Sequence, residues 1–412
     1  MSLTRPPWRS SQLHNSALAP GPLHEPPLSA EGSRERPVPA AAPPLTPIVV
    51  RFGRLGDMIM LTAVLHLLRK RYHQPCVVLG AGAWNAQVYR GHPDVAQICS
   101  FPRHAPFVLS PTWWRALRIL HRTDPSPIYV CERHPRQLAR VRRLLAWSGI
   151  NPARCLFITD MPTDGSEPWV DYFVRFGERT PSTLRAADYP PPQSDCLPAP
   201  CLTVLDSERV SIEAWLNAKG WGGRRLVLVQ PGNYRSMSSG RKRWRRLKAD
   251  DKAWPVSHWA QLLAKVRARL PDARVLLCGA PAEAPMLREI AAVAACPEVV
   301  VASLRLRQLF ALCERAHSMI SVDTGPGHAA AALGVPLTVI FGAEPSRLWL
   351  PRGPASSPVL GVGGPPASVR VEQIPVDDVF RTWCALLAKM ESSAEMGARA
   401  VNDRPAAAEL RS

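Results

Sequence analysis

The chain has 412 residues, 46% of them hydrophobic, and a formal net charge of +18. This length exceeds one ordinary hydrophobic core and fits two domains, and the composition excludes a wholly disordered chain. No apolar run reaches the roughly 18–20 residues of a membrane span, and the N-terminus lacks the apolar segment of a secretory signal. We therefore expect a cytoplasmic protein, with peripheral association at the inner face of the cytoplasmic membrane as a further possibility.

The positive charge predicts an anionic partner: nucleic acid, a membrane surface or a phosphorylated substrate. Seven basic residues and no acid lie in "RSMSSGRKRWRRLK" (235–248), whose loop-like composition favours an anionic partner. A second cluster, "RHPRQLARVRR" (133–143), has a helical pattern and favours a solvated helix face instead. The ten cysteines form no C-x-x-C pair, so we expect reduced, buried thiols and no metal site.

Residues 1–46 form a Pro-rich segment, which we expect to be a disordered tail. Residues 47–180 then alternate short apolar runs with helical periodicity, which predicts a first domain with a parallel sheet. Its expected strands are 48–51, 76–80, 95–100, 127–132 and 155–160, and its expected helices are 58–72, 113–121 and 136–147.

A Pro-rich linker is expected at 181–202, and the alternation restarts in a second domain at 203–385. Residues 386–412 are expected to form a flexible tail. Because ligands of such sheets bind at the carboxyl ends of strands, the loops after Arg51, Val229, Leu277 and Val322 are expected to face a cleft between the domains. The second domain's expected elements are strands at 225–232, 273–281, 299–303, 317–323 and 337–343, and helices at 256–270, from 283, at 306–316 and in the alanine-rich segment after 324.

The loop "FGRLGD" follows the first strand and contains a single G-x-x-G pair, which is a weak phosphate-binding signal. Asp57 begins the next helix, where the helix dipole favours an acid. The same carboxylate, if it faces the cleft, is a candidate general base. From this segment alone the structural interpretation is favoured.

Lys252 lies in "DDKAWPVSHW", just before Trp254-Pro255 and an expected helix. A cleft-facing lysine can neutralise phosphate charge on a leaving group, although a solvated surface lysine is the commoner case. The basic loop immediately before it favours the functional interpretation.

The segment "SVDTGPGHAAAALG" (321–334) is the most informative one. A strand ends at Val322, two glycines leave the backbone accessible, and an alanine-rich helix begins with its N–H groups directed at a possible anion. Asp323 and Thr324 can simply cap this helix. Since capping requires neither the second glycine nor His328, anion binding is favoured.

Together the three segments resemble glycosyltransferase family 9, the heptosyltransferases of the lipopolysaccharide inner core. The resemblance rests on "RFGRLGDMI", on Lys252-Ala-Trp-Pro255, on Asp323 through Pro336 (D-T-G-P-x-H-x-A-A-A-L-G-x-P) and on "LTVIFG", and it covers about 47–385. It implies the GT-B fold: an α/β protein with two Rossmann-like parallel-sheet domains facing across a cleft. It also implies inverting, metal-independent transfer from a nucleotide-sugar, typically ADP-heptose, to a phosphorylated glycolipid acceptor.

The resemblance also implies roles for residues. By position, Asp57 is the expected general base and Lys252 the group that stabilises the departing diphosphate. The donor site is expected to include Asp323, Thr324, Gly325, Gly327 and His328, with Glu283 at the ribose by a looser match. Further contacts to the acceptor or to phosphate are expected from Arg54, Arg241 and Arg243.

The chain departs from the family pattern at "EPS" (344–346), at Gly327 and in the length of the basic loop, which puts the sugar and the acceptor in question. Two other functions stay open. A nucleotide-sugar epimerase of the GT-B type would use the same phosphate site, and a nucleic-acid-binding protein would account for the charge, although the basic loop matches no known binding module.

Overall fold

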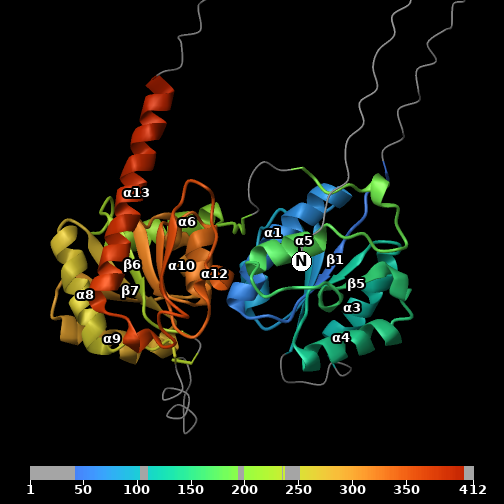
Figure 1. Cartoon of the computed structure of the whole chain (residues 1–412), viewed down its shortest axis with the longest axis horizontal. Coiled ribbons are helices and arrows are strands. Elements are labelled where there is room, and N and C mark those ends of the chain that lie inside the picture. Colours follow the sequence, from blue (N-terminus) through green and yellow to red (C-terminus); the bar gives the residue numbers. More distant parts are fainter. Residues whose placement is uncertain (1–41, 103–109, 194–198, 234, 237–250, 403–412) are drawn as a thin grey trace, which may run out of the picture. The chain divides into compact units, whose positions relative to one another are not determined.

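The computed structural model describes residues 42–102, 110–193, 199–233, 235–236 and 251–402, and the side chains only as far as 393. Most of the predicted N-terminal tail and nearly all of the basic loop, including Arg241 and Arg243, lie outside the described residues. The protein contains two parallel sheets with helices on both faces of each (Figure 1). No helix in the described part of the chain is long and apolar enough to cross a membrane.

The first sheet has the strand order β3-β2-β1-β4-β5, and all its pairings are parallel. Successive residues of a strand point to opposite faces, so Val49 packs toward α1 and α5 while Ile48 and Val50 pack toward α3 and α4. The elements are β1 (Ile48–Val50), α1 (Leu55–Tyr72), β2 (Cys76–Ala81), α2 (Trp84–Val88), β3 (Val95–Phe101), α3 (Pro111–Arg122), β4 (Ile128–Val130), α4 (Pro135–Trp147), β5 (Cys155–Phe157) and α5 (Trp169–Gly177).

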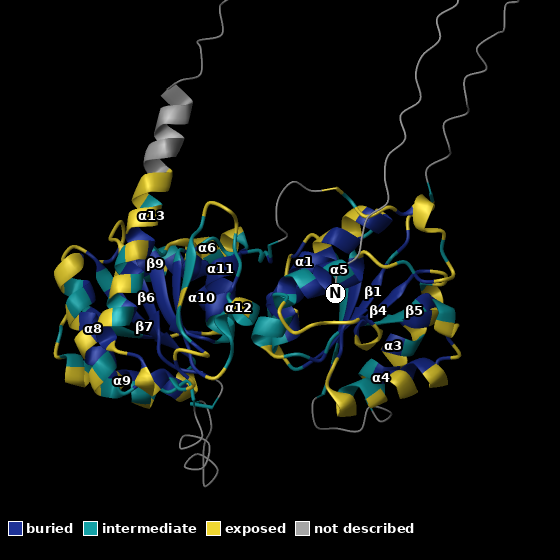
Figure 2. Ribbon diagram, viewed as in Figure 1, coloured by how far each residue is buried: buried dark blue, intermediate teal, exposed yellow. Residues whose placement is uncertain are grey.

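The second sheet has the order β11-β10-β9-β6-β7-β8 and is also parallel throughout. Its inner strands are buried almost throughout, as continuous aliphatic runs predict, while the edge strands β8 and β11 are only partly buried (Figure 2). The elements are α6 (Asp206–Ala218), β6 (Leu226–Gln230), α8 (Val256–Arg269), β7 (Arg274–Gly279), α9 (Ala284–Ala294), β8 (Val299–Ser303), α10 (Leu306–Glu314), β9 (Ser318–Val322), α11 (Gly325–Ala332), β10 (Leu337–Phe341), α12 (Ser346–Trp349), β11 (Val359–Gly363) and α13 (Val376–Asn402).

Short 3-10 turns connect several of these elements, at Pro152–Arg154, Ile158–Asp160, Ala186–Asp188, Pro281–Glu283 and Val371–Gln373. The strands expected from sequence are present, and α2, α5, α6, α12, α13 and β11 are elements that the sequence patterns did not single out. Helix α13 continues beyond residue 385, the end that we expected for the second domain. It buries Val379, Trp383, Leu386 and Leu387 against the second sheet, because these residues recur at helical spacing on one face.

Candidate active site

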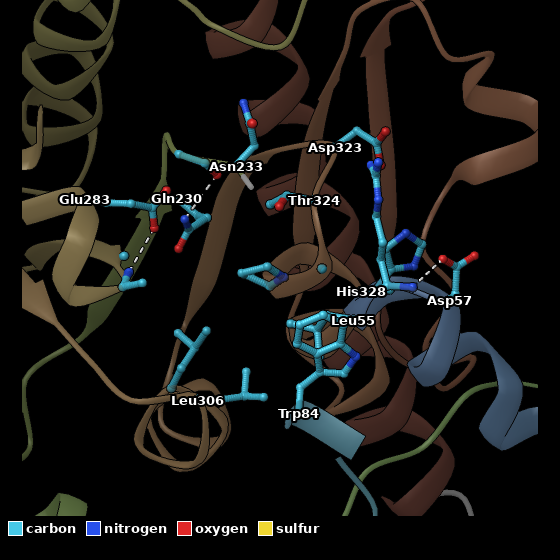
Figure 3. Close-up of a pocket in the computed structure, with 18 of the residues that line it drawn as sticks. Leu55, Asp57, Trp84, Gln230, Asn233, Glu283, Leu306, Asp323, Thr324 and His328 are labelled. Atoms are coloured by element: carbon cyan, nitrogen blue, oxygen red, sulfur yellow. Dashed lines mark hydrogen bonds between the residues drawn. The ribbon is translucent and has the colours of Figure 1, made fainter. Parts of the chain in front are cut away.

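A cavity of about 750 Å³ lies at the carboxyl ends of β1, β6, β7 and β9, where a doubly wound sheet binds its ligands. Its lining combines residues from both sheets: Leu55 and Asp57 come from α1, and Asp323 and Thr324 from the loop before α11. Figure 3 shows Glu283 and Gln230 on one side of this cavity, Asp57 on the opposite side, and Thr324 and His328 between them. The predicted loops therefore meet around one cavity.

Two glycines allow the N-termini of α1 and α11 to approach each other closely. A Cβ atom on Gly56 would lie 2.9 Å from Cδ2 of His328, and one on Gly325 would lie 2.8 Å from the Leu55 side chain. Real Cβ atoms do not make contacts this short, so a larger residue at either position would require these side chains or the helices to shift. Both glycines thus serve the packing between the two helix N-termini.

Asp57 is nearly buried and forms an ion pair with Arg51, with 2.6 Å between Oδ1 and Nη2. Its other carboxylate oxygen accepts a 2.8 Å hydrogen bond from the backbone N–H of Arg54. Burial by itself would raise the pKa of this carboxyl, but the Arg51 charge and these hydrogen bonds outweigh it and lower the pKa below its ordinary value. Asp57 therefore presents an ionised carboxylate to the cavity at neutral pH.

Lys252 and Asp323 form the second ion pair of the cavity. Nζ of Lys252 lies 2.5 Å from Oδ2 of Asp323 and donates a further 3.1 Å hydrogen bond to the Asp323 backbone carbonyl. The lysine side chain is one-fifth exposed, and both residues line the cavity. The sequence prediction of a cleft-facing Lys252 is consistent with this position.

His328 is almost fully buried at the N-terminal end of α11. Burial lowers the pKa of its imidazole, and the nearby Lys252 charge acts in the same direction, while Asp323 and Asp57 oppose them. The ring is therefore neutral at pH 7, and it can donate a hydrogen bond without adding a charge. The imidazole interacts electrostatically with the carboxylates of Asp323 and Asp57, so His328 lies between the two ion pairs.

Two of the backbone N–H groups at the start of α11, where the sequence predicts an anion site, are used within the helix. The N–H groups of Gly327 and His328 both donate to the Thr324 carbonyl, at 3.0 and 3.3 Å, and Pro326 has no N–H. A Cβ atom on Gly327 would face Oγ of Ser321 at 3.3 Å, and Gly327 does not line the cavity. Gly327 thus packs helix α11 against strand β9, since the small residue is needed on the side away from the cavity.

Glu283 ends the 3-10 turn Pro281–Glu283 at the far side of the cavity and is buried. Its carboxylate accepts hydrogen bonds from Oγ of Ser236 at 2.5 Å and from the backbone N–H of Ala280 at 2.8 Å. Burial raises the pKa of this carboxyl above its ordinary value, although the hydrogen bonds oppose the shift. A buried carboxylate with such partners can accept hydrogen bonds from ligand hydroxyl groups.

Several lining residues have no signal in the sequence. Trp84 is in the short helix α2, and Leu306 and Leu309 are in α10, so their apolar side chains form one wall of the cavity. Gln230 and Asn233 follow β6 at its carboxyl end. For Gln230 and Asn233, the only sequence signal was their position directly after a buried strand. The apolar lining residues have the same sequence pattern as ordinary core residues. The lining also includes Gln87, Leu304, Arg305, Glu344 and Trp349.

A second cavity of about 300 Å³ shares Asp57 with the first. Its lining is cationic and aromatic, and the guanidinium of Arg133 lies over the ring of Trp169 at 4.5 Å from the ring centroid. Trp349 lines both cavities. The complete lining is Arg51, Asp57, Arg133, His134, Trp169, Phe173 and Trp349. Asp57 therefore lies where two ligands, one in each cavity, would meet.

Of the three arginines that we predicted as contacts, Arg54 lines the larger cavity, and Arg241 and Arg243 belong to the undescribed loop. Among the described residues, His92, Asp94 and Cys201 place potential metal-ligand atoms within 4.8 Å of one another. None of these three residues lines either cavity. The cluster is accordingly separate from the candidate active site.

Comparison with known proteins is consistent with the geometry. Residues 245–365 match the model of glycosyltransferase family 9 (heptosyltransferase). This segment contains Lys252, Glu283 and the 321–334 segment, but it leaves out Asp57. No curated protein sequence matches the chain.

Solved structures show the same fold. The family 9 glycosyltransferase of Veillonella parvula DSM 2008 is 16% identical with a TM-score of 0.63, and the match covers 84% of this chain and 99% of that one. The ADP-heptose lps heptosyltransferase II of E. coli is 18% identical with a TM-score of 0.61, covering 84% and 100%. The E. coli heptosyltransferase WaaC with ADP is 16% identical with a TM-score of 0.54, covering 83% and 100%. The chain thus has the GT-B fold of two Rossmann-like domains, as predicted.

Proposed function

We propose that the chain is a glycosyltransferase of family 9, whose model matches residues 245–365, and that it moves a heptose from ADP-heptose to a glycolipid of the lipopolysaccharide-core type. The reaction is an inverting displacement and does not need a metal ion. The single observation that supports this proposal most strongly is the position of Asp57, an ionised carboxylate on the wall shared by the two cavities.

The larger cavity is the proposed donor site. Its apolar wall, formed by Trp84, Leu306 and Leu309, fits the face of a purine, and Glu283 is suited to accept hydrogen bonds from ribose hydroxyl groups. Among the cationic residues of its lining, Arg54, Lys252 and Arg305, Lys252 is the one that we assign to the diphosphate. A volume of about 750 Å³ agrees with a ligand of nucleotide-sugar size. This donor is also the ligand class that the family model suggests.

The smaller cavity is the proposed acceptor site. A sugar ring can stack on Trp169 or Trp349, and Arg133 offers a charge for a carboxylate or phosphate on the acceptor. Because Asp57 lines this cavity as well, an acceptor hydroxyl can reach its carboxylate. An acceptor of the phosphorylated glycolipid class agrees with this lining, and such an acceptor would bring the enzyme to an anionic membrane surface.

The proposed reaction needs one displacement. The acceptor oxygen attacks the anomeric carbon of the heptose while the bond from that carbon to the diphosphate oxygen breaks, and Asp57 takes the hydroxyl proton. The electron pair of the broken bond leaves with ADP, whose diphosphate is stabilised by Lys252. Attack from the side opposite the diphosphate inverts the anomeric configuration. A cavity closed to water would limit hydrolysis of the donor.

A donor panel tests the proposal. ADP-heptose is expected to raise the melting temperature more than GDP-, UDP- or dTDP-sugars, since a ligand that binds only the folded state stabilises it. ADP release is then expected only when a lipopolysaccharide-core acceptor is added. Interconversion of a free nucleotide-sugar without any acceptor would contradict the proposal and support an epimerase.

A further inference from the structure

Helices α3 and α4 lie next to each other on one face of the first sheet (Figure 1). Their inward residues belong to one core cluster, and the rings of Trp113 and Trp147 meet at 5.9 Å between centroids. Their outward residues leave a surface, here called the α3–α4 face, that no described helix or strand of the chain covers (Figure 2).

Six arginines are exposed on this face, and neither helix contains an acidic residue. Within the described parts of the chain, none of the six forms an ion pair with a carboxylate. Two exposed arginines of the second domain do have carboxylate partners, since Arg209 pairs with Glu314 and Arg315 with Glu213. The six are Arg115, Arg118, Arg122, Arg136, Arg142 and Arg143.

Two tryptophans add apolar surface to the same face. The side chains of Trp114 and Trp147 are 64% and 69% exposed, the largest exposed hydrophobic side chains among the described residues. An indole ring favours the boundary between lipid headgroups and acyl chains, and arginines around it attract anionic headgroups. Two exposed indole rings are not expected on a helix face that contacts only water, because their apolar surface is unfavourable there.

The α3–α4 face also leads toward the catalytic carboxylate. Helix α4 starts at Pro135, and the two residues before it, Arg133 and His134, line the smaller cavity beside Asp57. A lipid-anchored acceptor at this face would therefore have its sugar near the proposed acceptor site. The helical pattern of residues 133–143 by itself favours a solvated helix face, and the exposed tryptophans change that interpretation.

We propose that the α3–α4 face is the surface by which this enzyme binds an anionic lipid bilayer. The proposal rests on the proposed function only for the reason why a membrane is the partner: the acceptor is a glycolipid. Nucleic acid would satisfy the arginines as well, but nothing in the proposed reaction brings the enzyme to a nucleic acid.

Co-sedimentation of the full chain with vesicles tests the proposal. Vesicles of phosphatidylcholine with 30% phosphatidylglycerol (about one lipid in three, enough to give an anionic surface) are expected to bind the protein, and added salt is expected to weaken binding. The variant R118Q/R122Q/R136Q/R143Q is expected to lower the partition coefficient by about tenfold or more. The variant W114A/W147A is expected to lower it by a smaller factor.

Matched controls separate a local effect from a loss of total charge. The variant R224Q/R225Q/R269Q/R288Q removes four exposed arginines of the second domain, and Val293→Ala removes an exposed apolar side chain. Both are expected to bind vesicles like the wild type, and ADP-induced thermal stabilisation checks that every variant is folded. Equal loss in the arginine control and the α3–α4 variant would overturn the proposal.

Two further outcomes would also overturn it: equal binding to vesicles of phosphatidylcholine alone, and binding to duplex DNA or RNA with no binding to anionic vesicles. Vesicle binding is measured without donor or acceptor. Its failure therefore leaves transfer to a water-soluble acceptor fragment intact, whereas failure of the proposed function would abolish that transfer and leave vesicle binding unchanged.

Discussion

The two ion pairs of the larger cavity are built in different ways. Arg51 and Asp57 are six residues apart, on the strand end and helix start of one loop, whereas Lys252 and Asp323 are 71 residues apart and are joined by the second sheet. Of the first pair only the Asp57 carboxylate lines the larger cavity, whereas both the Lys252 ammonium and the Asp323 carboxylate of the second pair line it. The second pair thus brings a cation to the larger cavity that the first does not, and the proposed displacement uses that cation at the leaving group and the Asp57 carboxylate as the base.

The largest effect is expected from Asp57→Asn, which keeps the shape of the side chain but removes the proton acceptor. Turnover is expected to fall by about 10²–10⁴-fold, the usual contribution of a general base, while thermal stabilisation by the donor is retained. The matched control is Asp206→Asn, which changes an exposed acid in the first turn of α6. Near wild-type turnover in Asp57→Asn would contradict the assigned base.

A smaller loss is expected from Lys252→Gln, which removes the cation of the second pair. One electrostatic contact to a leaving group contributes about 10²–10³-fold, so kcat is expected to fall by about 10²-fold. Steady-state ADP release measures this change. Lys265→Gln is the control, because Lys265 also pairs with an aspartate, Asp377, but lies at the surface. An effect on KM alone would show that Lys252 only binds the donor.

The smallest effect near neutral pH is expected from Arg51→Gln, and it appears as a shift of the pH profile. Arg51 lowers the pKa of Asp57, so the wild type keeps an ionised base, and hence activity, below the ordinary aspartate range. Without the Arg51 charge the pKa of Asp57 rises, and activity is expected to be lost at higher pH as the solution is acidified.

Arg51→Lys is the companion variant for that profile. It keeps the charge and is expected to keep the acidic limb near that of the wild type, while circular dichroism at each pH confirms folding. An unchanged acidic limb in Arg51→Gln would show that Arg51 does not set the protonation of the catalytic group.

The sequence predicted the fold class, and it indicated several loops that line the cavity. Aliphatic runs alternating with helical periodicity indicate parallel α/β domains, and the glycine-containing loops after β1, β6 and β9 line the cavity. Arg51, Arg54 and Asp57 interact within seven residues, so a short motif was sufficient to place them together. Gly327 shows the limit of such motifs, because a glycine beside a ligand and a glycine beside a neighbouring strand look alike in sequence.

By itself, then, the sequence determined two parallel-sheet domains, a carboxylate at the start of α1 and a lysine and an aspartate in loops after strands. Only the tertiary structure decided that Lys252 pairs with Asp323, that Trp84 and Leu306 share one wall, and that Gly56 and Gly325 let two helix N-termini meet. The physical reason is the sequence distance over which each kind of interaction acts. Periodicity and capping act within a few residues, whereas these contacts depend on the packing of elements far apart in the chain.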